Sequence, residues 1–181
     1  MEIPAETKKL IQTRIGEIRQ KYPEAQAACL PALYVCQDSL NYISDDVLDL
    51  VADTLELPSA FVQGVATFYT MYNKKAVGRY HLQLCTNVSC LLNGAEELLH
   101  GIESHLGIKN GQTTKDGLFS LNEVECLAAC GTAPVLQVND KYYEEMTLEK
   151  VKSLLDGLKA KAKDAPKGGG DPTPNAEVPE A

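Results

Sequence analysis

The spacing of apolar residues separates a helical first part of the chain from a mixed second part. In the first segment, Leu10, Ile11, Ile15 and Ile18, together with Lys9, give positions at helical spacing that are expected to form the apolar face. Further along, Ser44 followed by two aspartates predicts an N-cap for a helix over 47–55, because acids favour the positive end of a helix. Residues 1–77 are therefore predicted to form a helical domain, a small bundle whose helices are separated at prolines.

The pattern changes at Gly78. Tyr80, Leu82 and Leu84 alternate with polar residues, which predicts a strand that runs directly into Cys85. The remaining elements predicted are a helix over 91–106 with Leu91 on its apolar face, strands over 118–124 and 135–138, a hairpin turn at 139–140, and a helix from 148 to about 161.

This order of elements predicts the fold class. Strand, helix, strand, hairpin and helix is the order of a thioredoxin-like half-fold, in which helices cover a mixed sheet. We therefore expect an α/β protein with an N-terminal helical bundle over 1–77 and a mixed-sheet domain over 78–163. Residues 164–181 are rich in proline and glycine and are predicted to be a disordered tail.

Composition and charge restrict the function. The chain has 181 residues, of which 44% are hydrophobic, enough for packed cores. No run approaches the roughly 18 apolar residues of a membrane span, and the first residues lack a signal-peptide pattern, so a reducing cytoplasmic location is expected. The formal net charge of −8 argues against nucleic-acid binding and favours protein partners.

Two close cysteine pairs, Cys85-x4-Cys90 and Cys126-x3-Cys130, indicate a metal centre. A [2Fe-2S] cluster needs two thiolates on each iron, and three or four intervening residues suit that arrangement. Structural zinc favours two intervening residues, although up to four are tolerated. A redox disulfide of the thioredoxin type also has two intervening residues. The spacing favours the cluster and leaves zinc and disulfides open.

Further residues with possible chemistry have plainer interpretations. Cys29 and Cys36 lie among apolar residues and are interpreted as free buried thiols. Asn87 and Ser89 either donate hydrogen bonds to the sulfurs or cap a helix. The three histidines are surplus to a four-cysteine site. The bond before Pro134 is open to either isomer.

An aromatic cluster lies in the segment that joins the two parts. It serves either as core or as a docking surface, for which aromatic side chains are favoured. Its members are Phe61, Phe68, Tyr69 and Tyr72.

The cysteines are not accompanied by a nucleotide-binding signature. The chain has neither a Gly-x-Gly-x-x-Gly motif nor a P-loop. Because hydride chemistry needs a flavin or nicotinamide site, this chain alone is expected to relay single electrons.

The motifs resemble a known family. The segments 85–90 (CTNVSC) and 123–134 (EVECLAACGTAP), with 34–38 (YVCQD) and 64–71 (GVATFYTM) upstream, are similar to the 24 kDa (NuoE-type) subunit family of respiratory complex I. The resemblance covers residues 20 to about 160.

That resemblance implies a thioredoxin-like domain that binds one [2Fe-2S] cluster through Cys85, Cys90, Cys126 and Cys130. It also implies a tight flavoprotein partner that carries FMN, the NADH site and a [4Fe-4S] cluster. The two subunits would form the electron-input end of NADH:quinone oxidoreductase, in a peripheral arm at the inner membrane, with the [2Fe-2S] cluster near FMN but off the main path to quinone. NAD-linked hydrogenases and formate dehydrogenases contain similar subunits. The residues also leave open a free-standing ferredoxin and a zinc-stabilised interaction module.

Overall fold

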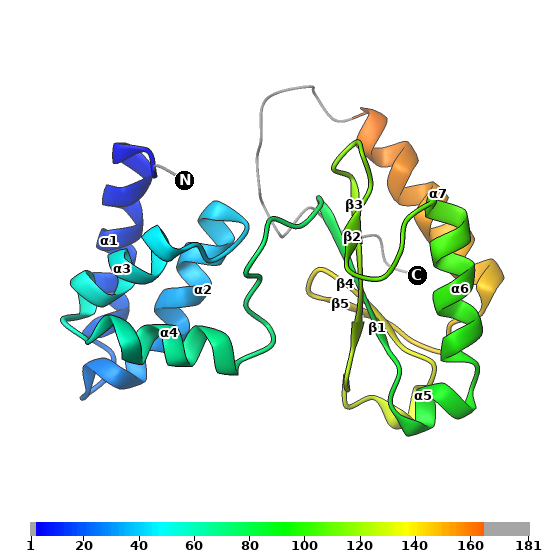
Figure 1. Cartoon of the computed structure of the whole chain (residues 1–181), viewed down its shortest axis with the longest axis horizontal. Coiled ribbons are helices and arrows are strands. Elements are labelled where there is room, and N and C mark those ends of the chain that lie inside the picture. Colours follow the sequence, from blue (N-terminus) through cyan, green and yellow to red (C-terminus); the bar gives the residue numbers. More distant parts are fainter. Residues whose placement is uncertain (1–2, 165–181) are drawn as a thin grey trace. The chain divides into compact units, whose positions relative to one another are not determined.

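The computed structural model describes residues 3–164. Of the predicted tail over 164–181, Asp164 ends a helix and the other residues lie outside the described residues. The chain divides into two compact units, Met1–Ala76 and Val77–Ala181. Between residues 3 and 164, no helix is long and apolar enough to cross a membrane. The elements of the first unit are α1 (Ala5–Arg19), the short 3-10 helix η1 (Ala25–Ala28), α2 (Cys29–Leu40), α3 (Asp45–Leu55) and α4 (Ser59–Phe68) (Figure 1).

The helices of the first unit bury one face each against a common core. From α1, Ile11 and Ile15 are fully buried, as the spacing predicted, whereas Leu10 of the same predicted set is 51% exposed. They pack in one cluster with Leu33 and Val51. Tyr72 closes this core, and its hydroxyl donates a hydrogen bond to the Leu30 carbonyl oxygen at 2.9 Å. The polar end of a buried tyrosine is thereby satisfied.

Helix α3 begins at the predicted N-cap residue, Ser44, but the Ser44 backbone makes the hydrogen bonds in place of its side chain. Ser44 is the N-cap residue and Asp45 and Asp46 occupy the first turn, as expected. The Ser44 side chain, however, makes no capping bond, and its buried Oγ has no hydrogen-bond partner in the described chain. The backbone carbonyl of Ser44 instead accepts from the amides of Val47 and Leu48, both at 3.0 Å.

The second unit is a mixed sheet with helices. The strands lie in the order β2-β3-β1-β4-β5, where β1 and β3 are parallel and the remaining neighbours are antiparallel. The elements are β1 (Tyr80–Cys85), α5 (Val88–Leu92), α6 (Ala95–Leu106), β2 (Gln112–Thr113), β3 (Phe119–Val124), η2 (Cys130–Thr132), β4 (Leu136–Val138), β5 (Lys141–Tyr143) and α7 (Leu148–Asp164).

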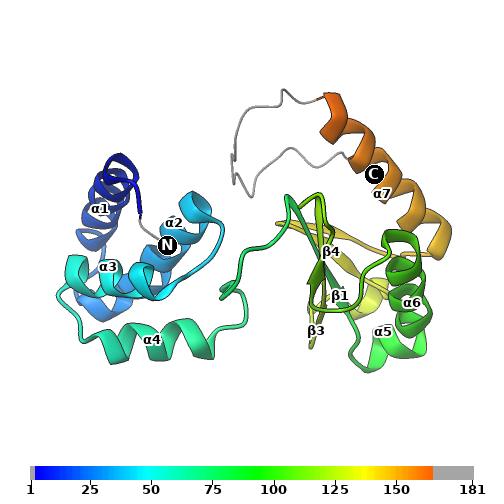
Figure 2. The same ribbon diagram turned by 45° about the horizontal axis from the view of Figure 1, so that its top comes forward.

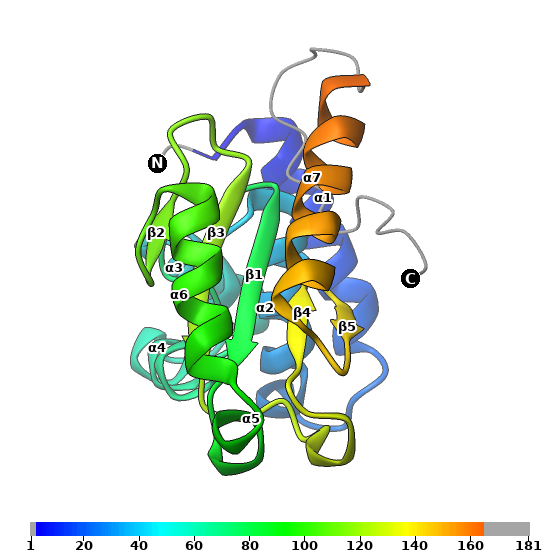
Figure 3. The same cartoon turned by 90° about the vertical axis from the view of Figure 1, so that its right-hand side faces the viewer.

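Both long helices of this unit, α6 and α7, cover the same face of the sheet (Figures 1 and 3). Tyr80, Leu82 and Leu84 of β1 point into this core together with Ile102 of α6 and Leu155 of α7. The predicted fold class is confirmed: a helical unit is followed by a mixed sheet.

One predicted helix is two helices. The expected helix over 91–106 breaks at Gly94, whose φ of +92° is a left-handed conformation that favours glycine. The short α5 lies next to the first turn of α6 (Figure 2). As a result Leu91, predicted on the buried face, belongs to α5 and is 49% exposed. Strand β2 is too short to give an alternating pattern and was not predicted.

His81 is expected to make the stability of the second unit depend on pH. It points to the face opposite Leu82, and its Nε2 lies 2.8 Å from Asn122 Oδ1. Burial lowers the pKa of His81, and the Asn122 hydrogen bond opposes this only in part. Because the unfolded chain then binds the proton more readily, stability should fall as the pH drops below about 6.5.

We expect NMR titration to give His81 a pKa below the ordinary value. His81→Gln should flatten the corresponding part of the curve of unfolding free energy against pH. A His81 that titrates at or above the ordinary histidine pKa would contradict this prediction.

Candidate metal centre

Parallel pairing of β1 and β3 brings the two cysteine pairs to one edge of the sheet. Cys85, the last residue of β1, is in register with Val124, the last residue of β3 and two positions before Cys126. The carboxyl ends of parallel strands share an edge, and the two loops lie there beyond the arrowhead of β1 (Figure 3). The amide of Thr86 donates to the Val124 carbonyl at 3.3 Å, which holds the loop starts together.

Side chains of α5 fix the first loop and join it to the second. Asn87 is the N-cap, and its Oδ1 accepts from the amide of Val88 at 2.9 Å. Ser89 donates through its hydroxyl to the carbonyl of Cys130 at 3.0 Å. Both side chains therefore order the backbone, which is the capping interpretation for Asn87 and a loop-bridging role for Ser89.

Burial differs between the two pairs of thiols. Cys85 and Cys90 are 4% and 2% exposed, whereas Cys126 and Cys130 are exposed. The buried pair packs in a small apolar cluster with Ala95 and Val135, apart from the main core of the sheet. Three half-buried residues surround this cluster: Leu127, Ala129 and Ala133. The centre thus has an apolar inner side and an outer side open to partners.

Hydrogen bonds around Cys85 favour its thiolate. Burial opposes ionisation, but the backbone amides of Asn87 and Leu127 and the thiols of Cys90 and Cys126 donate to it and lower its pKa. Burial raises the pKa of Cys90, as does its interaction with Cys85, and Cys130 adds to the effect. The groups that shift these two pKa values come from both loops.

The second loop also carries a donor to sulfur. The amide of Ala128 donates to Cys126 Sγ at 3.2 Å, and Ala128 has a φ of 58°. The following Ala133–Pro134 peptide bond, open to either isomer in the sequence, is cis.

The four thiols are soft donors of the kind that Fe–S clusters and zinc both take. Among the residues that the structure describes, no group of three or more His, Cys, Asp or Glu side chains is placed to hold a metal ion. The Cys90 and Cys126 thiols donate to Cys85, and Cys130 acts on Cys90 electrostatically, so both loops contribute thiols at this edge. Such a spread fits a group that takes two thiolates on each of two irons.

The remaining two cysteines belong to the first unit. Cys29 and Cys36 are buried free thiols, which confirms their interpretation. Burial raises the pKa of Cys29 to about 11 and that of Cys36 to about 12, so both stay protonated near neutral pH.

The predicted aromatic cluster divides between core and surface. Tyr72 lies in the core, whereas Phe68 is 77% exposed.

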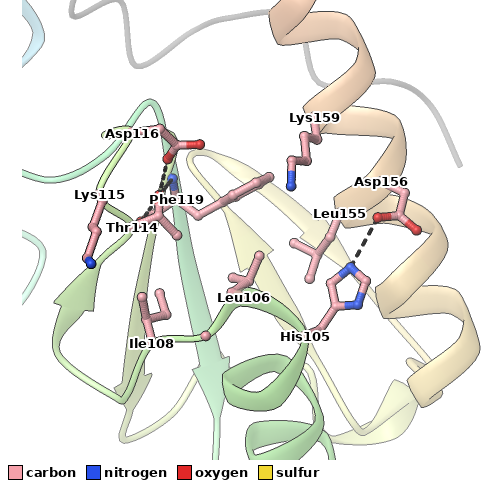
Figure 4. Close-up of a pocket in the computed structure, with 11 residues that line it drawn as sticks. His105, Leu106, Ile108, Thr114, Lys115, Asp116, Phe119, Leu155, Asp156 and Lys159 are labelled. Carbon is pink, nitrogen blue, oxygen red and sulfur yellow. Dashed lines mark hydrogen bonds and ion pairs between the residues drawn. The ribbon is translucent and has the colours of Figure 1, made fainter.

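A separate cavity of about 330 Å³ lies between the end of α6, α7 and the start of β3 (Figure 4). Its carboxylates are already engaged: His105 Nε2 lies 3.1 Å from Asp156 Oδ1, and Asp116 accepts from the Leu118 amide at 3.0 Å. No cysteine lines this cavity, so it is distinct from the candidate centre.

Comparisons with known proteins identify relatives of this chain. The family model for thioredoxin-like [2Fe-2S] ferredoxins matches residues 15–159. The E-type subunit numbered 2 of the NADH-quinone oxidoreductase of Rhizobium meliloti (strain 1021) is 44% identical over 140 residues, covering 77% of this chain and 83% of the relative. The E-type subunit of the same enzyme of Rickettsia felis (strain ATCC VR-1525 / URRWXCal2) is 43% identical over 143 residues, covering 77% and 86%.

Solved structures share the fold. An NAD⁺-reducing [NiFe]-hydrogenase in the H₂-reduced state superposes with a TM-score of 0.64 at 20% identity, covering 73% of this chain and 22% of that one. At that identity the likeness concerns the fold alone. The sequence relatives establish the family as well as the fold, because they match most of both chains at more than 40% identity. The resemblance inferred from the motifs is confirmed, and the chain belongs to the thioredoxin-like [2Fe-2S] ferredoxin family, with the E-type subunits of NADH-quinone oxidoreductases among its relatives.

Proposed function

We propose that this chain is an electron-transfer subunit of an NADH:quinone oxidoreductase and that Cys85, Cys90, Cys126 and Cys130 hold its [2Fe-2S] cluster. The observation that carries the proposal is the meeting of the two cysteine pairs at one edge of a parallel strand pair. Family membership and the names of the relatives support the choice of cluster and of enzyme class.

The residues around the thiols have separable roles in this proposal. When bound, a [2Fe-2S] cluster accepts and returns one electron at a time. The amides of Asn87, Leu127 and Ala128 donate to sulfur and so stabilise negative charge there. The apolar cluster of Ala95 and Val135 keeps water from the inner side. The Ser89 bridge holds the two loops in register.

The partner in this proposal is a flavoprotein subunit that binds FMN, NADH and a [4Fe-4S] cluster, with the [2Fe-2S] cluster near its flavin. The absence of a nucleotide-binding motif from the sequence requires that hydride chemistry take place on another chain. The relatives named as quinone oxidoreductase subunits favour this enzyme class over a hydrogenase or formate dehydrogenase.

The test is spectroscopy on the purified full-length chain under anaerobic conditions, with iron and sulfide analysis. We expect a red-brown protein with two iron and two sulfide atoms per chain and a paramagnetic EPR signal after dithionite reduction. The flavoprotein subunit of the same organism, purified with it, should then reduce the centre with NADH. A colourless protein that retains zinc would overturn the cluster and support an interaction module.

A further inference from the structure

Helix α5 exposes an apolar face. Val88, Leu91 and Leu92 are 68%, 49% and 80% exposed. Their spacing of three and four residues places them on one side of the helix, whereas Cys90 on the opposite side is buried. We name these three side chains the α5 patch. Contiguous exposed apolar groups of this kind mark interaction sites on soluble proteins.

The local fold does not require the α5 patch. The helix is held by the Asn87 cap, the Ser89 bridge and the bond from Asn93 Nδ2 to the Ser89 carbonyl at 2.7 Å. Its buried contacts come from Cys90, which packs with Ala95 and Val135. Polar side chains at these three exposed positions would be compatible with the same helix. The folding of the unit therefore does not explain why these positions are apolar.

The α5 patch borders the open side of the candidate centre. Leu91 follows Cys90 directly, and the Ser89 bridge joins α5 to the loop that carries Cys126 and Cys130, whose thiols are exposed. An exposed glutamate, Glu125, precedes Cys126 on this loop. Apolar groups near exposed thiols, with an acid on the loop that carries those thiols, have the composition of an interface core with a charged rim.

We propose that the α5 patch is the docking surface for the NADH-oxidising flavoprotein subunit. This inference rests on the proposed function. Electron transfer weakens steeply with distance, so the partner must bind at the edge of the sheet where the thiols lie. The partner surface should be an apolar socket with a basic rim, complementary to Glu125 and to a chain of net charge −8. A second copy of this chain would bring the same negative charge and is disfavoured.

The experiment compares variants of the full-length, cluster-loaded chain in binding to the purified flavoprotein subunit by calorimetry. Leu92→Asp should weaken binding at least about tenfold, because it places a charge in a desolvated interface core. Leu92→Ala removes the same apolar contact without a charge and should give a smaller loss. The matched control is Leu10→Asp, which makes the same substitution at a 51% exposed position on α1, outside the family match.

The readouts separate this inference from the proposed function. Iron and sulfide content and the absorption spectrum should be unchanged in all three variants, since Leu92 and Leu10 lie outside every core cluster. Equal affinity of Leu92→Asp and wild type, with an intact spectrum, would overturn the docking surface and leave the proposed function standing. A wild-type chain without iron would overturn the proposed function itself.

Discussion

Replacing Cys126 with serine is expected to remove most of the iron and sulfide from the protein. Cys126 is exposed. Its sulfur accepts a hydrogen bond from the Ala128 amide, and its thiol donates one to Cys85, so Cys126 links its own loop to the first cysteine pair. Serine oxygen is a harder ligand than thiolate and has a far higher pKa, which disfavours iron in a cluster. The measurements are iron and sulfide content per chain and the visible absorption of the anaerobically purified variant.

Cys36→Ala is the matched control. Cys36 is a buried thiol of the first unit, protonated near neutral pH, and its replacement is expected to leave iron, sulfide and spectrum unchanged. Its removal costs only packing in the helical core. Unaltered iron content in Cys126→Ser would contradict the ligand assignment, and bleaching in Cys36→Ala would show that the helical unit contributes to the centre.

Replacing Gly78 with alanine is expected to destabilise the second unit by about 1–3 kcal/mol, the usual cost of overpacking. A Cβ at Gly78 would lie 2.9 Å from the Phe119 carbonyl carbon and 3.0 Å from both Gly117 O and Leu118 C. All three atoms are backbone, so no side-chain rotation relieves the contact. The Gly78 amide also donates to Ser120 Oγ at 2.6 Å, and that bond would be strained as β3 moves away.

Gly157→Ala in α7 provides a control of opposite sign in the same unit. Nothing lies within 4 Å of a Cβ there, and alanine exceeds glycine in helix propensity by about 1 kcal/mol. Denaturant unfolding monitored by circular dichroism gives the free energies, and hydrogen exchange of the β1 amides assigns them to the second unit. Shifts of the same sign in both variants would contradict the packing argument.

The fold was predictable where one side of an element is buried. The alternation of Tyr80, Leu82 and Leu84 located β1, because each faces a core that polar residues avoid. Local patterns failed where backbone conformation decides. Leu91 continues the apolar spacing of α6, and only the left-handed conformation of Gly94 assigns it to another helix.

For the candidate centre, the sequence proposed a set of residues but not a surface. The cysteine spacing and the resemblance named four residues, which the parallel pairing then brings to one edge. The sequence could not show which pair is buried, because the burial of Cys85 and Cys90 comes from Ala95 and Val135, which lie outside both cysteine motifs. The sequence also could not distinguish the burial of Phe68 from that of Tyr69. The two rings are adjacent in sequence and contact each other, yet Tyr69 is half-buried and Phe68 is exposed.

Parallel pairing of β1 and β3 has a consequence for biosynthesis. Tyr80 pairs with Phe119 and Cys85 with Val124, so the two halves of the thiol set meet only after a long intervening segment has closed. A ribosome-bound chain that ends before Cys126 presents only one half. Under the proposed function, iron and sulfur can reach all four cysteines only after the second loop has been synthesised, so the centre would mature after the two parallel strands have paired.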